Sequence, residues 1–272
     1  MKRATEAEIF QAYTKRVRIL TPEYTEDLIP WHLDGNASPD PDLFRYIQHI
    51  EALTAVVYGP YLELTPSGRH PVISVFLKRW VTEETTHGEL FARYLQLRGI
   101  EIHPLPQHTG LDRFFEVIRT LPENLAGSAF ITLHMVWGAA NEFTTLALYQ
   151  RIRKLSRDPV LSAILDGVII EEGRHAMFYN DIARLRLGKS RFEQIFVRTV
   201  MKLLWQPVGS GDLDPTPALQ IFAGDGIHIF CDKVTARINR LPGLADLCLT
   251  LAVQSAMQKR NIPFLPEKRP TT

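Results

Sequence analysis

The sequence predicts an all-α protein, and three observations support that prediction. Long stretches lack proline, from Pro71 to Pro104, from Pro122 to Pro159 and from Pro159 to Pro207. An internal proline removes a backbone donor and clashes with the preceding turn, so long helices can form only in such stretches. These stretches are rich in Leu, Ala, Glu and Arg, and their apolar residues recur three and four positions apart. Strand-like alternation nowhere extends beyond a few residues.

Four long helices and three shorter ones are expected within one domain that covers residues 1–272. Asp42 suits the start of the first helix, and Gly59 followed by Pro60 suits its end or a kink. Segments rich in Pro, Gly, Asn and Asp separate the helices and are expected to be loops. The tail from residue 263 is expected to be loose. The expected helices cover about 42–62, 72–98, 123–155, 159–187, 190–205, 218–240 and 244–260.

Composition and charge exclude several classes of protein. The chain has 31 Lys and Arg against 30 Asp and Glu, and 45% of its residues are hydrophobic. This composition excludes wholesale disorder, and the near-neutral charge argues against a nucleic-acid partner. Apolar runs fall short of the roughly 20 residues that span a bilayer, and the charged N-terminus does not resemble a signal peptide. Two cysteines cannot build a disulfide framework. We therefore expect a cytoplasmic protein without a membrane span.

Two of the expected long helices contain the same short motif, a Glu followed three positions later by a His. The pairs are Glu84 with His87 and Glu172 with His175. Residues three apart share one face of a helix, so the carboxylate and the imidazole can bind the same pair of metal ions. One such motif arises readily by chance, because Glu is common. Two of them in one helical protein indicate a metal site more strongly.

Both motifs lie on apolar stripes, so we expect them to face the protein interior. A carboxylate in such a stripe must be desolvated, which is very costly unless the carboxylate is paired. The alternative is that the motifs are surface charges or buried polar groups satisfied by hydrogen bonds. The two stripes are Phe76, Trp80, Glu84, His87 and Phe91, and Leu161, Leu165, Val168, Glu172, His175, Tyr179 and Ile182.

A carboxylate-bridged site in a four-helix bundle needs one further Glu from each of the other two long helices. Glu142 fits this role because it is the only acid between Glu123 and Asp158 and lies on an apolar stripe. On the first long helix Glu51 fits, with Glu63 as a nearby competitor. For each, a lone acid bonded to a buried donor is the alternative. Four glutamates and two histidines would complete the ligand set for two metal ions.

At these motifs the sequence resembles the soluble acyl-carrier-protein desaturases of the ferritin-like di-iron superfamily. The segment from Trp80 to Leu90 is similar to the Glu-Glu-x-x-His-Gly block of that family. The segment from Glu171 to His175 is similar to the second block, which also carries an Arg before the His. The resemblance covers roughly residues 40–260, with specific motifs only on these two helices. It implies an all-α, ferritin-like four-helix bundle with additional flanking and C-terminal helices.

The resemblance also implies a ligand set and a cofactor. Two ferrous ions would be bound per chain, and dioxygen would be the co-substrate. Thr145, one turn after Glu142, is the candidate catalytic residue, since the family often has a Thr there near the oxygen-binding side. Glu83 or Glu171 would accept hydrogen bonds from the outer nitrogens of the histidines. The implied metal ligands are Glu51, Glu84, His87, Glu142, Glu172 and His175.

The implied activity is an oxygen-dependent desaturase in fatty acid metabolism. Its substrate would be a fatty acyl chain on acyl carrier protein, its electron donor ferredoxin-like, and its assembly a homodimer. The chain is shorter than the plant enzymes, Thr85 and Thr86 replace a more polar pair, and Glu171 stands where Asp is usual. These departures leave open a di-iron monooxygenase that hydroxylates or N-oxygenates a small-molecule substrate. A bundle that binds iron without oxidising an organic substrate also stays open.

Two further features have both a functional and a structural interpretation. His134 lies two turns before Glu142 and could be a third histidine ligand, although packing or support of the site is favoured. A basic run could meet an acidic carrier protein, although such a run is more often a solvated face. The run comprises Arg184, Arg186, Lys189 and Arg191.

Overall fold

The all-α prediction is confirmed. The computed structural model describes residues 4–15, 18–32, 40–105, 123–207 and 213–265. Within these ranges the regular structure is helical, and the only β-type pairing is an isolated bridge between Gly224 and Phe264. Side chains of residues 123–126 are not described. Along those same ranges no helix is both long and apolar enough to cross a membrane.

The long helices lie close to where the proline gaps predict them. Asp40, rather than Asp42, caps the first of them, because its Oδ1 accepts hydrogen bonds from the backbone N–H groups of Asp42 and Leu43. Asp158 caps a later helix in the same way, just before a proline. The four long stretches are α2 (Pro41–Leu53) extended by a π-helical segment (Thr54–Tyr58) and α3 (Gly59–Glu63), α4 (Ile73–Leu97), α6 (Glu123–Leu155) and α7 (Pro159–Leu187).

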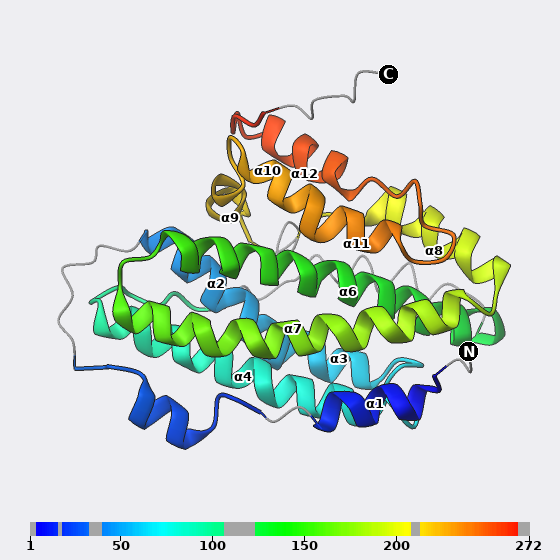
Figure 1. The fold of residues 1–272 in the computed structure, drawn as a ribbon, viewed down its shortest axis with the longest axis horizontal. Coiled ribbons are helices and arrows are strands. Elements are labelled where there is room, and N and C mark those ends of the chain that lie inside the picture. The colour runs from blue at the N-terminus through cyan, green and yellow to red at the C-terminus, as the bar shows by residue number, and fades with distance from the viewer. Residues whose placement is uncertain (1–3, 16–17, 33–39, 106–122, 208–212, 266–272) are drawn as a thin grey trace.

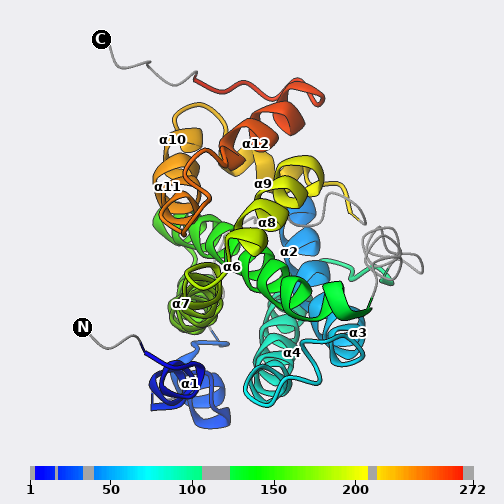
Figure 2. The ribbon, with the colours of Figure 1, turned by 90° about the vertical axis from the view of Figure 1, so that its right-hand side faces the viewer.

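These helices pack in two antiparallel pairs that meet in the interior. Figures 1 and 2 show α6 beside α7 and α2 beside α4, and α4 also contacts α7. Helix α8 (Arg191–Leu204) runs back along α6, and the remaining C-terminal helices cover the same side (Figure 1). An N-terminal helix that the sequence did not predict, α1 (Glu6–Lys15), packs on α7. The main apolar core therefore lies between the two pairs and under the C-terminal helices.

The C-terminal part differs from the prediction. The helix expected over 218–240 is broken at Gly224, whose φ of 60° interrupts regular helix. The tail expected to be loose from 263 is held for its first three residues. Gly224 N–H donates to the Pro263 carbonyl, and Leu265 N–H donates to the Gly224 carbonyl. The observed helices are α9 (Thr216–Ile221), α10 (Gly226–Phe230) continued by a π-helical segment (Cys231–Thr235) and α11 (Ala236–Asn239), and α12 (Leu249–Gln258) in place of 244–260.

A glycine lets α6 and α7 approach each other beside the interior cluster described below. A Cβ at Gly138 would lie 2.4 Å from the Tyr179 ring. We expect Gly138→Ala to lower the free energy of unfolding by about 1–3 kcal/mol, because the buried Tyr179 ring has to move. Gly127→Ala on the same helix is the matched control, because a Cβ there meets nothing within 4 Å. In urea denaturation, the free energy of unfolding of Gly127→Ala should equal that of the wild type or exceed it by up to about 1 kcal/mol. Equal effects of the two changes would contradict this expectation.

Candidate metal centre

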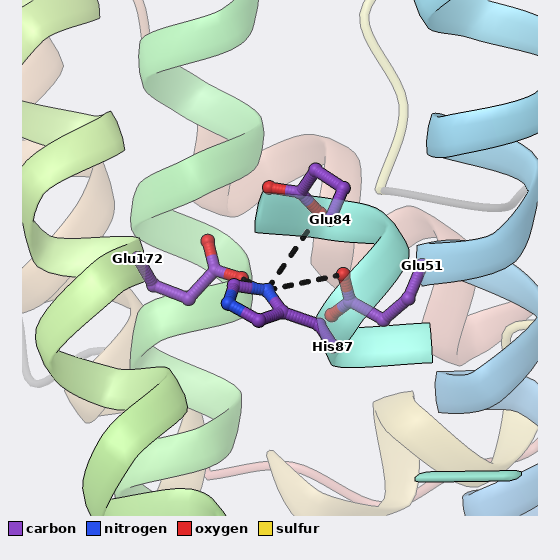
Figure 3. Close-up of side chains that lie close together, drawn as sticks. All are labelled: Glu51, Glu84, His87 and Glu172. Carbon is purple, nitrogen blue, oxygen red and sulfur yellow. Dashed lines mark ion pairs between the residues drawn. The ribbon is translucent and has the colours of Figure 1, made fainter. Parts of the chain in front are cut away.

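Six acidic and histidine side chains from four helices meet in the interior. They form two overlapping groups, and within each group one possible ligand atom per residue lies within 4.8 Å of the others. Figure 3 shows the first group, in which the His87 ring lies among three carboxylates. All six residues are buried. The groups are Glu51, Glu84, His87 and Glu172, and Glu84, Glu142, Glu172 and His175.

The structure thus brings together the six residues that the resemblance implied as ligands. Glu51 comes from α2, Glu84 from α4, Glu142 from α6 and Glu172 from α7. Glu84 and Glu172 belong to both groups, whereas each remaining residue belongs to one. The competitor Glu63 is exposed, one turn beyond the π-helical segment. The arrangement therefore offers two neighbouring four-donor positions that share two carboxylates.

The surroundings of the inner ring nitrogens, Nδ1 of His87 and Nδ1 of His175, indicate whether the cluster fits metal ions. His87 Nδ1 lies 3.1 Å from Glu172 Oε1, and His175 Nδ1 lies 3.1 Å from Glu84 Oε1. All four of these buried atoms nevertheless lack a hydrogen-bond partner among the described residues. Buried polar atoms are normally hydrogen-bonded. Donor atoms that converge without hydrogen-bond geometry are what a cation site requires, so the residues fit a pair of metal ions.

The outer nitrogens of the histidines are held in a crossed arrangement. His175 Nε2, on α7, donates to Glu83 Oε2 of α4 at 2.7 Å. His87 Nε2, on α4, donates to Glu171 Oε2 of α7 at 3.1 Å. The sequence suggested that these two acids support the histidines, and the structure shows that each supports the histidine of the opposite helix. Such carboxylates fix the ring orientation and leave Nδ1 free to bind a metal ion.

The N-terminal segment holds both supporting carboxylates from outside. The Tyr13 hydroxyl donates to Glu83 Oε2 at 3.1 Å. The backbone N–H groups of Ile19 and Leu20 donate to Glu171 Oε1 at 2.8 and 3.0 Å. Sequence reasoning missed these contacts. They join residues 70 or more positions apart, and backbone donors leave no side-chain pattern to recognise.

Two aromatic side chains donate hydrogen bonds to Glu51 and Glu142, the two glutamates that belong to only one of the four-donor groups. Trp80 Nε1 donates to Glu142 Oε1 at 2.9 Å. The Tyr149 hydroxyl donates to Glu51 Oε1. Trp80 lies on an apolar stripe identified in the sequence and Tyr149 lies on the same helix as Glu142, but nothing in the sequence indicated that these rings would contact the carboxylates. These donors hold one oxygen of each carboxylate, so its position is fixed before any metal ion binds.

Without a cation, the cluster holds extra protons. Burial, together with the negative charges of neighbouring glutamates, raises the pKa of Glu84 and Glu142 well above the usual range. Burial alone would also raise the pKa of Glu172, but the adjacent His175 and His87 rings lower it. Four buried carboxylates cannot all ionise without compensation. Two divalent cations would supply the four positive charges that allow them to do so.

An apolar cavity lies on the α6 side of the cluster, between α2, α6 and the C-terminal helices. Thr145, the candidate catalytic residue, is on its wall with Thr144 and Tyr149. Apolar side chains such as Ile47 and Phe230 complete much of the remaining wall. Tyr149 therefore contacts both the cavity and, through its hydroxyl, Glu51. Thr145 is not a member of either four-donor group.

The other two features of the sequence have structural roles. His134 Nδ1 lies 2.7 Å from the Ser67 hydroxyl, and the ring is buried outside both four-donor groups. In the basic run, Arg186 points inward and donates to Glu6, Ser128 and Thr132. The run is therefore not one continuous solvated basic face.

No family model matches the chain, and searches of curated proteins and of solved structures find no match either. The functional conclusion therefore depends on the geometry and chemistry of the buried cluster. What these establish is a buried Glu and His site that could hold metal ions.

Proposed function

We propose that the protein binds two ferrous ions in this cluster and uses dioxygen to oxidise an organic substrate. The observation that supports the proposal is the pair of four-donor positions that share Glu84 and Glu172. Carboxylate and imidazole donors suit iron or manganese, and no cysteine is among these donors. Two such ions, when bound, can supply an oxidant able to take hydrogen from an unactivated carbon.

The residues of the chain would position the ions and keep water out. Glu84 and Glu172, which belong to both groups, would help to hold both ions. His87 and Glu51 would complete one position, while His175 and Glu142 would complete the other. The cluster is buried, which favours oxidation of the substrate over side reactions with water.

For the substrate we propose an apolar chain, in keeping with the apolar cavity lined by Tyr149, whose hydroxyl donates to Glu51. The resemblance at the two motifs favours a fatty acyl chain on acyl carrier protein, desaturated by an enzyme of ferritin-like fold. Desaturation breaks one C–H bond on each of two adjacent carbons, releases two electrons and two protons, and leaves a C=C bond between those carbons. A ferredoxin-like donor would supply two more electrons and the solvent two more protons, so that dioxygen is reduced to two waters. Product analysis distinguishes this reaction from hydroxylation or N-oxygenation, in which one oxygen atom is retained in the product.

The first test is the iron content of the chain after anaerobic loading with ferrous iron. We expect about two ions per wild-type chain. Glu51→Ala is expected to remove about one of them, because Glu51 belongs to one group only. Glu63→Ala, which removes an exposed acid from the same helical stretch, is the matched control and should bind as the wild type does.

The outcomes separate the possible functions. One ion or none in the wild-type protein would overturn the dinuclear proposal, and none would leave the cluster as buried polar packing. Two ions with dioxygen consumption but no change in an acyl-carrier substrate, given a reduced ferredoxin, would overturn the desaturase proposal. Two ions with no substrate oxidation of any kind would favour iron binding alone.

A further inference from the structure

We propose that Tyr13 is a positioning residue for one of the two metal positions, the one that contains His175. The inference rests on the proposed metal centre. It adds to that centre a residue from α1, outside the four helices that supply the ligands. Tyr13 contacts no ligand directly, so it acts through the carboxylate of Glu83.

A single oxygen atom connects Tyr13 to His175. Glu83 Oε2 accepts the Tyr13 hydroxyl at 3.1 Å and the His175 Nε2–H at 2.7 Å. The other oxygen of Glu83 is 3.3 Å from both Arg174 and Arg79. The Tyr13 hydroxyl thus completes the set of donors that hold this carboxylate. The carboxylate in turn orients the His175 ring, so that Nδ1 faces the cluster.

The Tyr13 ring is itself fixed, so its hydroxyl is presented in one place. It packs edge-on to Phe76 with ring centroids 5.2 Å apart, and it is 5% exposed. The Arg174 guanidinium lies over the same ring, 5.0 Å from its centroid. A phenylalanine can keep these contacts and would lack only the hydroxyl.

The other metal position is supported in a different way. Glu171 accepts the hydrogen bond of His87 Nε2. Its other hydrogen bonds come from the backbone N–H groups of Ile19 and Leu20 and not from a tyrosine. Removing the Tyr13 hydroxyl should therefore weaken the His175 position and leave the His87 position unchanged. A general loss of stability could not produce this difference between two adjacent positions.

The test is a cobalt(II) titration of the full chain, followed by ligand-field absorption and by competition with a chelator. The Glu142→Ala variant identifies the spectral band and binding step of the His175 position. In Tyr13→Phe we expect the dissociation constant of that position to rise about fivefold, the effect of one hydrogen bond. Its absorption band should shift, and the His87 position should keep its affinity and band.

Tyr24→Phe is the matched control. It removes a phenol hydroxyl from the same N-terminal segment, where that hydroxyl donates to the Ala163 carbonyl of α7 at 3.1 Å. We expect both cobalt positions in this variant to match those of the wild type. In a Glu83→Gln background, Tyr13→Phe should have little further effect, because its route to His175 is already altered.

Each outcome decides the inference. If Tyr13→Phe matches the control, or weakens both positions equally, Tyr13 is not a positioning residue and the metal centre stands. An undiminished effect in the Glu83→Gln background would also overturn the inference. If the wild-type chain binds no cobalt at all, the proposed function fails and the inference fails with it.

Discussion

Glu172→Ala is expected to abolish the binding of both metal ions, whereas Glu142→Ala should remove only one. Glu172 belongs to both four-donor groups and lies close to the inner nitrogens of both histidines, 3.1 Å from that of His87 and 3.6 Å from that of His175. Its loss leaves three donors at each position and removes a charge that the two ions share. Glu142 serves one position only.

Iron analysis after anaerobic loading checks this expectation, with circular dichroism to establish that both variants keep their helices. Substrate oxidation should be lost in Glu172→Ala, since the proposed reaction needs both ions. A Glu172→Ala protein that retains one ion at wild-type affinity would show that the two positions do not share this carboxylate.

The metal-free protein is expected to lose stability as the pH rises from about 5 to about 8. In the folded chain, burial and neighbouring negative charges hold the pKa of Glu84 and Glu142 well above the usual 4.5. Burial opposes protonation of His87 and His175, but adjacent carboxylates raise the pKa of both well above 6.5. The folded state therefore keeps protons that the unfolded state releases. Each such group lowers the free energy of unfolding by about 1.4 kcal/mol per pH unit until its folded pKa is reached.

Urea denaturation at several pH values in the presence of a chelator measures this slope. Glu142→Gln should make the slope shallower, because the amide cannot release a proton. Loading with metal ions should reduce it as well, because the ions hold the ligands in their deprotonated forms. Glu171 and Glu172, whose pKa values are lowered, contribute stability that is already complete above about pH 4.5 and that is lost only below it. Stability that is flat or rises over the window would contradict the expected charge state of the cluster.

The helices and the cluster could be predicted because helical periodicity leaves a clear pattern in the sequence. A charged residue within an apolar stripe stands out, as Glu51, Glu84, Glu142 and Glu172 do. The contacts around them could not be predicted in the same way. Tyr13 and Tyr149 are ordinary core residues in the sequence, and only the folded chain shows their hydroxyl groups on carboxylates.

The sequence pattern also could not predict where the C-terminal helices end. The expected helix over 218–240 has continuous apolar spacing, but Gly224 adopts a positive φ and pairs with the chain near Pro263. That pairing joins segments about forty residues apart, so local propensity could not reveal it. The carrier-protein, electron-donor and homodimer predictions concern partners and stay predictions.

The crossed support of the histidines fixes the register of α4 against α7. Glu83 and Glu171 each reach across to the opposite helix, so sliding either helix by one turn, about 5.4 Å, would break both supports at once. The two supports therefore restrain α4 from sliding along α7. Helices α2 and α6 each contribute a single glutamate, and each of these glutamates accepts one hydrogen bond from another helix, Glu142 from Trp80 of α4 and Glu51 from Tyr149 of α6. Because the apolar cavity lies between α2, α6 and the C-terminal helices, any opening that admits a substrate is expected on that side.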